Sequence, residues 1–366
     1  MAEKGRGKPN MKVFIDILTP KQCMLFDKLS QKLAKKGHEV FRSTREYREV
    51  VQLLRLKGIE AKVLGKHGGG DLFTKLRESS KRTLQLATVI KAWSPNVVVS
   101  FSSPEAARAA FGLGIPHVCI NDSPHAEAVA RLTIPLAQKL LTSKMIPVEA
   151  WTKFGISKDS IVQYDALDAW AWLQDFKPDR KILADLRLDA TRPIITFRTE
   201  ETFAAYLLHK VQEIPAVASI IQTLVRASKD VQVVVIPRYE KQIDVLENIF
   251  REKVLICQAA VDAPSLLSFT SIFVGAGGTM TSEAALLGVP TFSCYPEESY
   301  LIEKYLLSKG LAIRETNPRK LVKRILSTLE TLETARKKQS EKARRLTSTF
   351  EDPVDVMVKT IESVCA

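Results

Sequence analysis

The segment that decides the fold is Phe273–Pro290, which reads FVGAGGTMTSEAALLGVP. An apolar stretch ends in a run of glycines, and a stretch of small, helix-forming residues follows and stops at Gly288. Glycines permit backbone angles that other residues avoid, and the order strand, glycine turn, helix is typical of one unit of a parallel sheet. The segment therefore predicts an α/β fold in this part of the chain.

An earlier segment repeats this order. Ser102–Pro116 reads SSPEAARAAFGLGIP and also leads into an apolar stretch, His117–Ile120. Its Gly-x-Pro stop begins at Gly114, about half a chain length before the stop that begins at Gly288. We therefore predict two similar, doubly wound Rossmann-like domains that face one another across a central cleft. The alternative is that any two βαβ units look alike.

The rest of the chain alternates short apolar stretches with amphipathic ones, as parallel sheets flanked by helices require. One expected helix, Arg45–Lys57, directly follows a short strand that begins at Val40. We divide the chain into a basic, disordered arm at residues 1–10, an N-terminal domain at 11–177, a C-terminal nucleotide-binding domain at 178–349 and a helix at 350–366. This last helix is expected to pack back on the N-terminal domain.

Composition excludes several classes of protein. Hydrophobic residues make up 45% and charged residues 26% of 366, which is typical of globular chains and not of disordered ones. No apolar stretch approaches the roughly 20 residues of a membrane-spanning helix, and no signal peptide is evident. The five cysteines form no CxxC pair, which indicates a reducing, cytoplasmic location and no metal site. The net charge of +13 favours anionic partners.

The glycine turn is the first candidate site. Gly277 and Gly278 would let a ligand approach the backbone, and free amides at a helix start attract phosphate. Thr279 and Ser282 could add hydroxyl donors, whereas the Glu283 carboxylate suits ribose hydroxyls better than phosphate. The alternative is a turn that merely packs the helix on the strand, because a glycine cluster alone is weak evidence.

The second candidate site is Asn121–Glu127, which follows a predicted strand at the sheet edge where ligands bind in open α/β folds. Asp122, His125 and Glu127 are of the residue types that transfer protons near neutral pH, so we predict catalytic roles for all three. The alternative is an Asx turn at Asp122 and an acidic helix start.

Two arginines end predicted strands of the second half. Arg198 could clamp a phosphate, and Arg238, which follows a second strand, would face the same way. The alternative for each is an exposed arginine without a role. Near the first strand, Lys21 and Gln22 are candidate substrate contacts only.

Phe273–Pro290 resembles the donor-binding signature of the GT-B superfamily, which includes UDP-N-acetylglucosamine 2-epimerases and the N-acetylglucosaminyltransferase that forms lipid II. From Met11 to Val364 the chain further resembles an uncharacterised, largely archaeal family related to those enzymes. The other stretches that carry this likeness are Lys66–Gly69, Ser103–Arg108, Asn121–Ala126, Phe176–Pro178 and Phe350–Pro353.

The resemblance implies two Rossmann-like domains, metal-independent chemistry without a cofactor, and a nucleotide-sugar substrate in the cleft. It implies that Gly277, Gly278 and Thr279 hold the diphosphate and that Glu283 binds the ribose. In the epimerases a histidine lies beside an arginine in the stretch that corresponds to Thr196–Glu201, and here Phe197 takes its place. This departure counts against epimerase chemistry.

The favoured function is therefore a GT-B glycosyltransferase that uses a UDP-sugar donor. Its acceptor would be a sugar, a polyol or a lipid-linked molecule, and the basic segment Arg336–Arg345 could touch the anionic inner face of a membrane. The alternatives are a UDP-N-acetylglucosamine 2-epimerase-like enzyme and a non-catalytic basic binding protein. Nucleic acid is not favoured as a partner, because the positive charge is scattered and no recognised module is present. The oligomeric state is left open.

Overall fold

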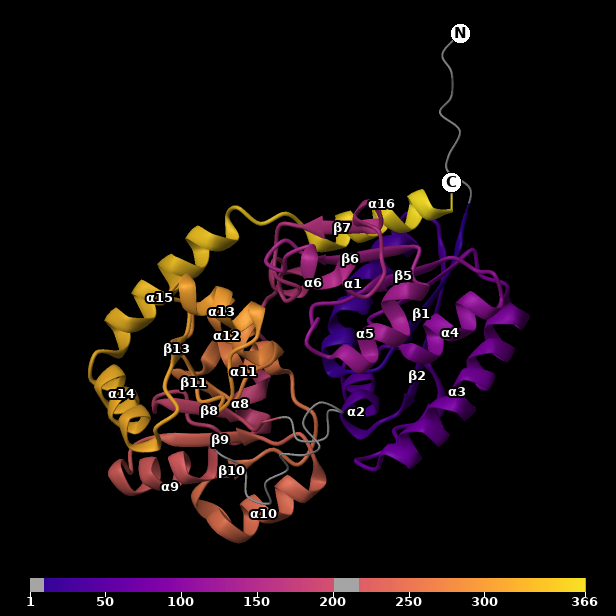
Figure 1. The fold of residues 1–366 in the computed structure, drawn as a ribbon. Coiled ribbons are helices and arrows are strands. Elements are labelled where there is room, and N and C mark those ends of the chain that lie inside the picture. The colour runs from indigo at the N-terminus through magenta and orange to yellow at the C-terminus, as the bar shows by residue number, and fades with distance from the viewer. Residues whose placement is uncertain (1–9, 201–216, 366) are drawn as a thin grey trace.

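The alternating apolar stretches form two parallel sheets, one in each half of the chain, with helices on both faces of each sheet (Figure 1). The computed structural model describes residues 10–200 and 217–365. Apart from Asn10, the predicted basic arm lies outside the described residues. The two sheets confirm the predicted α/β class with two doubly wound domains.

The N-terminal domain carries a seven-stranded sheet in the order β3-β2-β1-β4-β5-β6-β7. Its strands are β1 (Lys12–Ile17), β2 (Glu39–Glu46), β3 (Lys62–Lys66), β4 (Val97–Ser100), β5 (His117–Ile120), β6 (Lys139–Ser143) and β7 (Ile161–Tyr164). The strand order reverses between β1 and β4, which places the ligand crevice of this fold at their carboxyl ends.

The C-terminal domain repeats this topology with six strands in the order β10-β9-β8-β11-β12-β13. They are β8 (Ile194–Arg198), β9 (Gln232–Ile236), β10 (Leu255–Ile256), β11 (Ile272–Gly275), β12 (Thr291–Ser293) and β13 (Ile313–Arg314). The reversal lies between β8 and β11. The two repeated segments therefore occupy equivalent places, since each supplies the helix that follows the strand beside the reversal.

Helices cover both faces of each sheet. Those of the N-terminal half are α1 (Pro20–Lys35), α2 (Arg48–Leu56), α3 (Leu72–Trp93), α4 (Pro104–Gly112), α5 (Glu127–Thr133), α6 (Glu149–Thr152) and α7 (Trp170–Leu173). Those that follow are α8 (Lys181–Asp185), α9 (Val217–Ala227), α10 (Glu240–Phe250), α11 (Ala263–Phe269), α12 (Thr279–Leu286), α13 (Leu301–Ser308), α14 (Pro318–Glu330), α15 (Leu332–Thr347) and α16 (Pro353–Val364). None of the helices among the described residues combines the length and apolar character that crossing a bilayer requires.

Alternation along β1 shows how the first sheet is covered. Val13, Ile15 and Ile17 are buried in one core cluster with residues of α1, α2 and α16, whereas Phe14 is buried in another with residues of α3 and α4. Asp16 lies on the same face as Phe14, because successive side chains of a strand point to opposite faces. A carboxylate is thus buried beneath α3 and α4.

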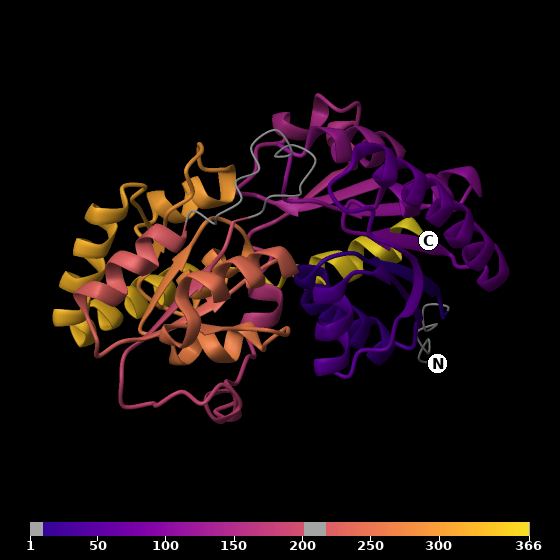
Figure 2. The same ribbon diagram turned by 90° about the horizontal axis from the view of Figure 1, so that it is seen from below.

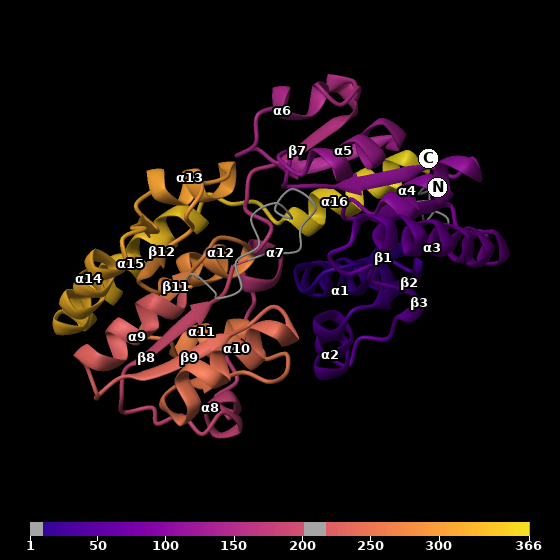
Figure 3. The same cartoon turned by 60° about the horizontal axis from the view of Figure 1, so that its bottom comes forward.

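The last helix crosses back to the first domain. After α14 and α15 run along the C-terminal domain, α16 lies along the N-terminal domain and packs on α1 (Figures 1 and 2). Lys32 of α1 forms ion pairs with Asp352 and Asp355 at 2.7 Å each, and Lys36 forms one with Glu362. The short helix α7 contacts α1, α12 and α16, so it lies where the two domains meet (Figure 3).

One predicted boundary is wrong. The expected helix from Arg45 begins only at Arg48, because β2 continues to Glu46. This strand pairs with β1 through Thr44 and with β3 through Glu46, and its backbone bonds to two neighbours outweigh local helix propensity. Arg45 is therefore a strand residue at the carboxyl edge of the sheet.

Candidate active site

The glycine turn lies at the carboxyl end of β11, beside the reversal of strand order. Gly277 and Gly278 have φ angles of +81° and +93°, which residues with a side chain rarely adopt. Gly278 is the N-cap of α12, and no side chain caps this helix among the described residues. The predicted phosphate-binding elements, with Thr279 at the first helical position, therefore lie together at an exposed helix start.

The two predicted arginines lie in different surroundings. Arg238 donates from Nε to the Thr199 carbonyl at 3.0 Å, and its Nη2 lies 3.0 Å from where a Cβ of residue 278 would be. Arg198 instead donates to the carbonyls of Ile236 and Pro237 and forms a 3.0 Å ion pair with Glu49 of α2. Arg238 therefore lies at the glycine turn, whereas Arg198 joins the two domains.

Glu283 also faces the junction between the domains. It is 3% exposed, and its Oε1 accepts a hydrogen bond from the indole Nε1 of Trp172 in α7 at 2.8 Å. Burial raises the pKa of this carboxyl to about 7, although the Trp172 bond favours the ionised form. Ser282, one residue before it, is also buried. The indole of Trp172 thus contributes to the region in which we predicted a ribose.

A cavity of about 590 Å³ lies between the domains. It is lined by Leu56 and Lys57 at the end of α2, by Ile182 of α8 and by residues 257–262. Lys57 and Asp262 form a 2.9 Å ion pair in the wall of this cavity. The charge of Asp262 raises the pKa of Glu283, and that of Lys57 lowers it. The size lies within the range of small-molecule sites, so the space suits a nucleoside.

Across the junction, a buried lysine lies between two carboxylates. The ammonium of Lys21, in the first turn of α1, forms ion pairs with Asp122 after β5 and Asp168 after β7. Asp168 also accepts a hydrogen bond from the hydroxyl of Tyr164. The Lys21 ammonium also lies 4.3 Å from the ring centroid of Phe101, which follows β4. Residues at the carboxyl ends of β1, β4, β5 and β7 therefore meet here. We call Lys21, Asp122, Asp168 and Tyr164 the lysine cluster.

The pKa values of the two carboxyls in the lysine cluster are shifted in opposite directions. Burial alone would raise the pKa of Asp122, but the charge and hydrogen bond of Lys21 outweigh it and lower that pKa. Burial raises the pKa of Asp168 despite Lys21, and the neighbouring Asp122 raises it further. Burial would lower the pKa of Lys21, but the two carboxylates raise it. Asp122 is therefore the more acidic of the two carboxyls, since two close carboxylates titrate apart.

The predicted catalytic residues separate into two groups. Asp122 belongs to the lysine cluster, and Asn121, not Asp122, accepts the Asx-type hydrogen bond from the amide of Ser123 at 2.8 Å. The His125 ring stacks on Tyr300 of the C-terminal domain with centroids 3.5 Å apart. Glu127 is exposed and interacts with Arg131 and Lys153 at the surface, so the structure does not bring it to the lysine cluster.

Aromatic contacts connect the two halves of the candidate site. The Tyr300 hydroxyl lies 3.0 Å from that of Tyr295, and a Cβ at Gly277 would meet the Tyr295 ring at 3.7 Å. On the other side of His125, burial lowers the pKa of its imidazole, and the charge of Asp122 partly opposes this shift. Contacts therefore lead from the glycine turn through Tyr295 and Tyr300 to His125, and the charge of Asp122 acts on His125.

Sequence reasoning missed Asp168 and Tyr164 and treated Lys21 only as a substrate contact. Each follows or ends a strand of the N-terminal sheet, and that position is the one signal that could have indicated them. Gln22 is buried instead, where it accepts from the Leu18 amide and donates to the Phe101 carbonyl.

Comparison with known proteins shows where the chain belongs. A family model described as "Protein of unknown function (DUF354)" matches residues 11–365. The chain belongs to this family. A relative of this DUF354 protein, uncharacterized protein MJ0665 of Methanocaldococcus jannaschii, is 31% identical over 362 residues, which are 97% of this chain and 98% of that protein.

Solved structures show the fold class of the DUF354 protein. The UDP-GlcNAc 2-epimerase of Neisseria meningitidis, bound to UDP-GlcNAc, is 16% identical with a TM-score of 0.73, covering 96% of this chain and all of that one. The spinosyn forosaminyltransferase SpnP is 15% identical with a TM-score of 0.63, covering 98% of this chain and all of that one. The GT-B-like fold, with two Rossmann-like domains, is thereby confirmed.

Proposed function

We propose that this DUF354 protein is a metal-independent glycosyltransferase that uses a nucleotide-sugar donor. The observation that carries the proposal is the set of contacts that connects the glycine turn with His125, on which the charge of Asp122 acts. A helix start with free amides and side chains of the types that transfer protons thus lie around one junction, which supports transfer from a diphosphate leaving group. The 2-epimerase from Neisseria binds UDP-GlcNAc in a similar fold, so UDP is the nucleotide to test first.

Each part of the donor has a place in this proposal. The diphosphate lies at Gly277, Gly278 and Thr279, where helix amides and the Arg238 guanidinium stabilise the departing charge. The ribose reaches Glu283, and the base occupies the cavity lined by residues 257–262. Ser282 lies between the first two positions in sequence, and Arg198 acts by holding the domains together through Glu49.

Proton transfer falls to His125 and Asp122. Burial lowers the pKa of His125, so its imidazole is neutral near pH 7 and able to accept the proton of an acceptor hydroxyl. The ionised Asp122 stabilises the imidazolium that forms. Glu127 has no role in this scheme because it is exposed and ion-paired at the surface.

UDP is expected to stabilise the protein by about 2.7 kcal/mol when present at 100 times its Kd. Glu283→Ala and Gly278→Ala should remove the effect, the second because a methyl group there meets Arg238 and cannot keep the backbone angles. Gly114→Ala is the control, because Gly114 also has a positive φ but its Cβ would meet open space. Thermal unfolding with UDP, ADP and GDP checks this. If no nucleotide shifts the transition, the proposal fails and a non-catalytic basic binding protein is favoured.

Epimerisation is the second candidate, favoured by the likeness in fold to a 2-epimerase. Phe197 argues against it, because it takes the place of the histidine that the epimerases have there, and its ring is completely buried in the core of the C-terminal domain. NMR of UDP-N-acetylglucosamine incubated with the protein alone is expected to show no manno isomer. Appearance of that isomer without an acceptor would replace the transferase proposal. The acceptor, a sugar, polyol or lipid-linked molecule, and a relation to the lipid II-forming transferase stay predictions.

A further inference from the structure

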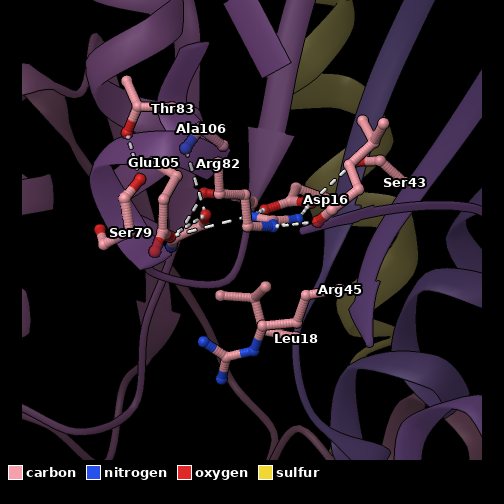
Figure 4. Close-up of polar contacts among 12 residues, drawn as sticks. Asp16, Leu18, Ser43, Arg45, Ser79, Arg82, Thr83, Glu105 and Ala106 are labelled. Carbon is pink, nitrogen blue, oxygen red and sulfur yellow. Dashed lines mark hydrogen bonds and ion pairs between the residues drawn. The ribbon is translucent and has the colours of Figure 1, made fainter. Parts of the chain in front are cut away.

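Arg45 is a half-buried arginine that no described residue neutralises by contact. Its Nε is buried and has no hydrogen-bond partner, and no ion pair joins its guanidinium to a carboxylate among residues 10–200 and 217–365. Figure 4 shows the guanidinium turned away from the Asp16–Arg82 pair, and no dashed line reaches it. A guanidinium that gives up water without gaining an acceptor costs free energy.

The carboxylates nearest to Arg45 bind other groups. Asp16 accepts two hydrogen bonds from Arg82, at 2.9 and 2.5 Å, and a third from Ser43 at 2.7 Å. Glu105 accepts from Ser103 at 3.2 Å and lies 3.7 Å from Arg82. Arg82 also donates to the Leu64 carbonyl at 2.9 Å. This network is complete without Arg45, so Arg45 is not needed to balance it by hydrogen bonds.

The neighbouring loop presents a second donor. His67 Nδ1 accepts a hydrogen bond from the Gly69 amide at 3.0 Å, so a neutral ring carries its proton on Nε2. Burial, Arg45 and Lys75 lower the pKa of His67 to about 4, so the ring is neutral near pH 7. The pairing of β2 with β3 changes register between Thr44 and Glu46 of β2. Such bulges re-aim side chains beside active sites. Arg45 and His67 thus lie together at the carboxyl ends of β2 and β3.

This location faces the C-terminal domain. The His67 ring lies 4.9 Å from that of Tyr47, whose hydroxyl donates to Glu49 at 3.4 Å. Glu49 in turn forms the ion pair with Arg198. Arg45 and His67 are therefore at the junction of the domains, on the N-terminal side, where an acceptor would enter.

We infer that Arg45 and His67 form an oxyanion subsite that holds a phosphate or carboxylate group of the acceptor. The inference rests on the proposed function and narrows its acceptor to an anionic molecule. A guanidinium fork with Nε–H and Nη–H donors, together with the Nε2–H of a neutral imidazole, matches the oxygens of either group. Its residues belong to the N-terminal domain, whereas those of the glycine turn belong to the C-terminal domain.

The test measures thermal unfolding of the full chain over concentration series of inorganic phosphate and of acetate, with UDP present to fill the donor site. Wild-type protein should respond to one of the two anions at about tenfold lower concentration than Arg45→Gln does. Arg55→Gln is the matched control, because Arg55 is exposed on α2 and its loss changes the net charge equally. The more effective anion identifies the group on the acceptor.

Without anions, Arg45→Gln should unfold at the same temperature as wild-type protein or a higher one, because an unpartnered charge is removed. Equal responses of wild type and Arg45→Gln would overturn the inference, and so would a strongly destabilised Arg45→Gln, which would make Arg45 a structural residue. His67→Phe should weaken the response as well. If UDP has no effect but phosphate or acetate still acts through Arg45, the proposed function fails and the subsite stands. If UDP shifts the transition but wild type and Arg45→Gln respond equally to phosphate and acetate, only the subsite is rejected.

Discussion

Replacing Lys21 by methionine is expected to destabilise the protein by about 3–5 kcal/mol near neutral pH. The lysine is 12% exposed and its partners Asp122 and Asp168 are 23% and 5% exposed, so its removal leaves two close carboxylates with little water to stabilise them. Methionine keeps the length and apolar contacts of the chain, which separates the effect of charge from that of packing. Chemical denaturation of wild-type and variant protein gives the difference in unfolding free energy.

The pH dependence of this loss follows from the same charges. Without Lys21, the folded-state pKa of Asp122 rises above its unfolded value, and that of Asp168, which is already raised, rises further. The loss of stability therefore appears as the pH rises through the unfolded value, and it shrinks again on acidification as both carboxyls take up protons. Lys91→Met, a change on the exposed side of α3, is the control. A Lys21→Met protein with wild-type stability at neutral pH would show that no charge balance operates in the lysine cluster.

The two carboxylates of the lysine cluster should also differ from one another. Asp168→Asn is expected to lower the free energy of unfolding less than Asp122→Asn does. Burial already raises the pKa of Asp168, whereas Lys21 lowers that of Asp122. Asp122 then contributes more than Asp168 to the stabilisation of the Lys21 ammonium. The opposite order of the two variants would make Asp168 the more acidic carboxyl.

Glu283→Gln is expected to stabilise the protein by up to about 3 kcal/mol at pH values above 7, and hardly at all below pH 4.5. Burial raises the folded-state pKa of this carboxyl from 4.5 to about 7. Between these values the unfolded chain loses its proton while the folded protein keeps it, so wild-type stability falls as the pH rises. Glutamine can still accept the hydrogen bond from Trp172, and it has no proton to lose.

The measurement for Glu283→Gln is the difference in unfolding free energy between variant and wild type at several pH values. Glu252→Gln on the surface serves as the control for the change in net charge. A difference that stays constant from about pH 5 to about pH 8 would mean that Glu283 is ionised throughout.

The fold was largely predictable because its signals are local. Strand, glycine turn, helix and Gly-x-Pro stop recur in Ser102–Pro116 and Phe273–Pro290, and both stops have glycines with positive φ, at +66° and +73°. The helix Leu72–Trp93 follows directly from its cap at Asp71, whose side chain accepts from Thr74. Arg45 was misplaced because hydrogen bonds to β1 and β3, which no local pattern shows, extend the strand that contains it.

The candidate site was predictable only in part. The glycine turn and Asp122 were evident because a strand end is followed by residues with chemical function. Arg198 and Arg238 both follow or end a strand in the sequence. Only the structure shows that Arg238 lies at the glycine turn and that Arg198 pairs with Glu49. Trp172 was not among the predicted site residues, yet its indole donates a hydrogen bond to Glu283 across the domain junction.

The amino-acid sequence alone determined the two parallel sheets, the repeated unit and the glycine turn, because hydrophobic period and backbone freedom act over a few residues. Only the tertiary structure decided which charges meet. Lys21, Asp122 and Asp168 come from three distant segments, and a parallel sheet brings them together because it gathers the carboxyl ends of its strands at one edge. Burial, another property of the folded chain, then set the pKa values of Asp168 and Glu283.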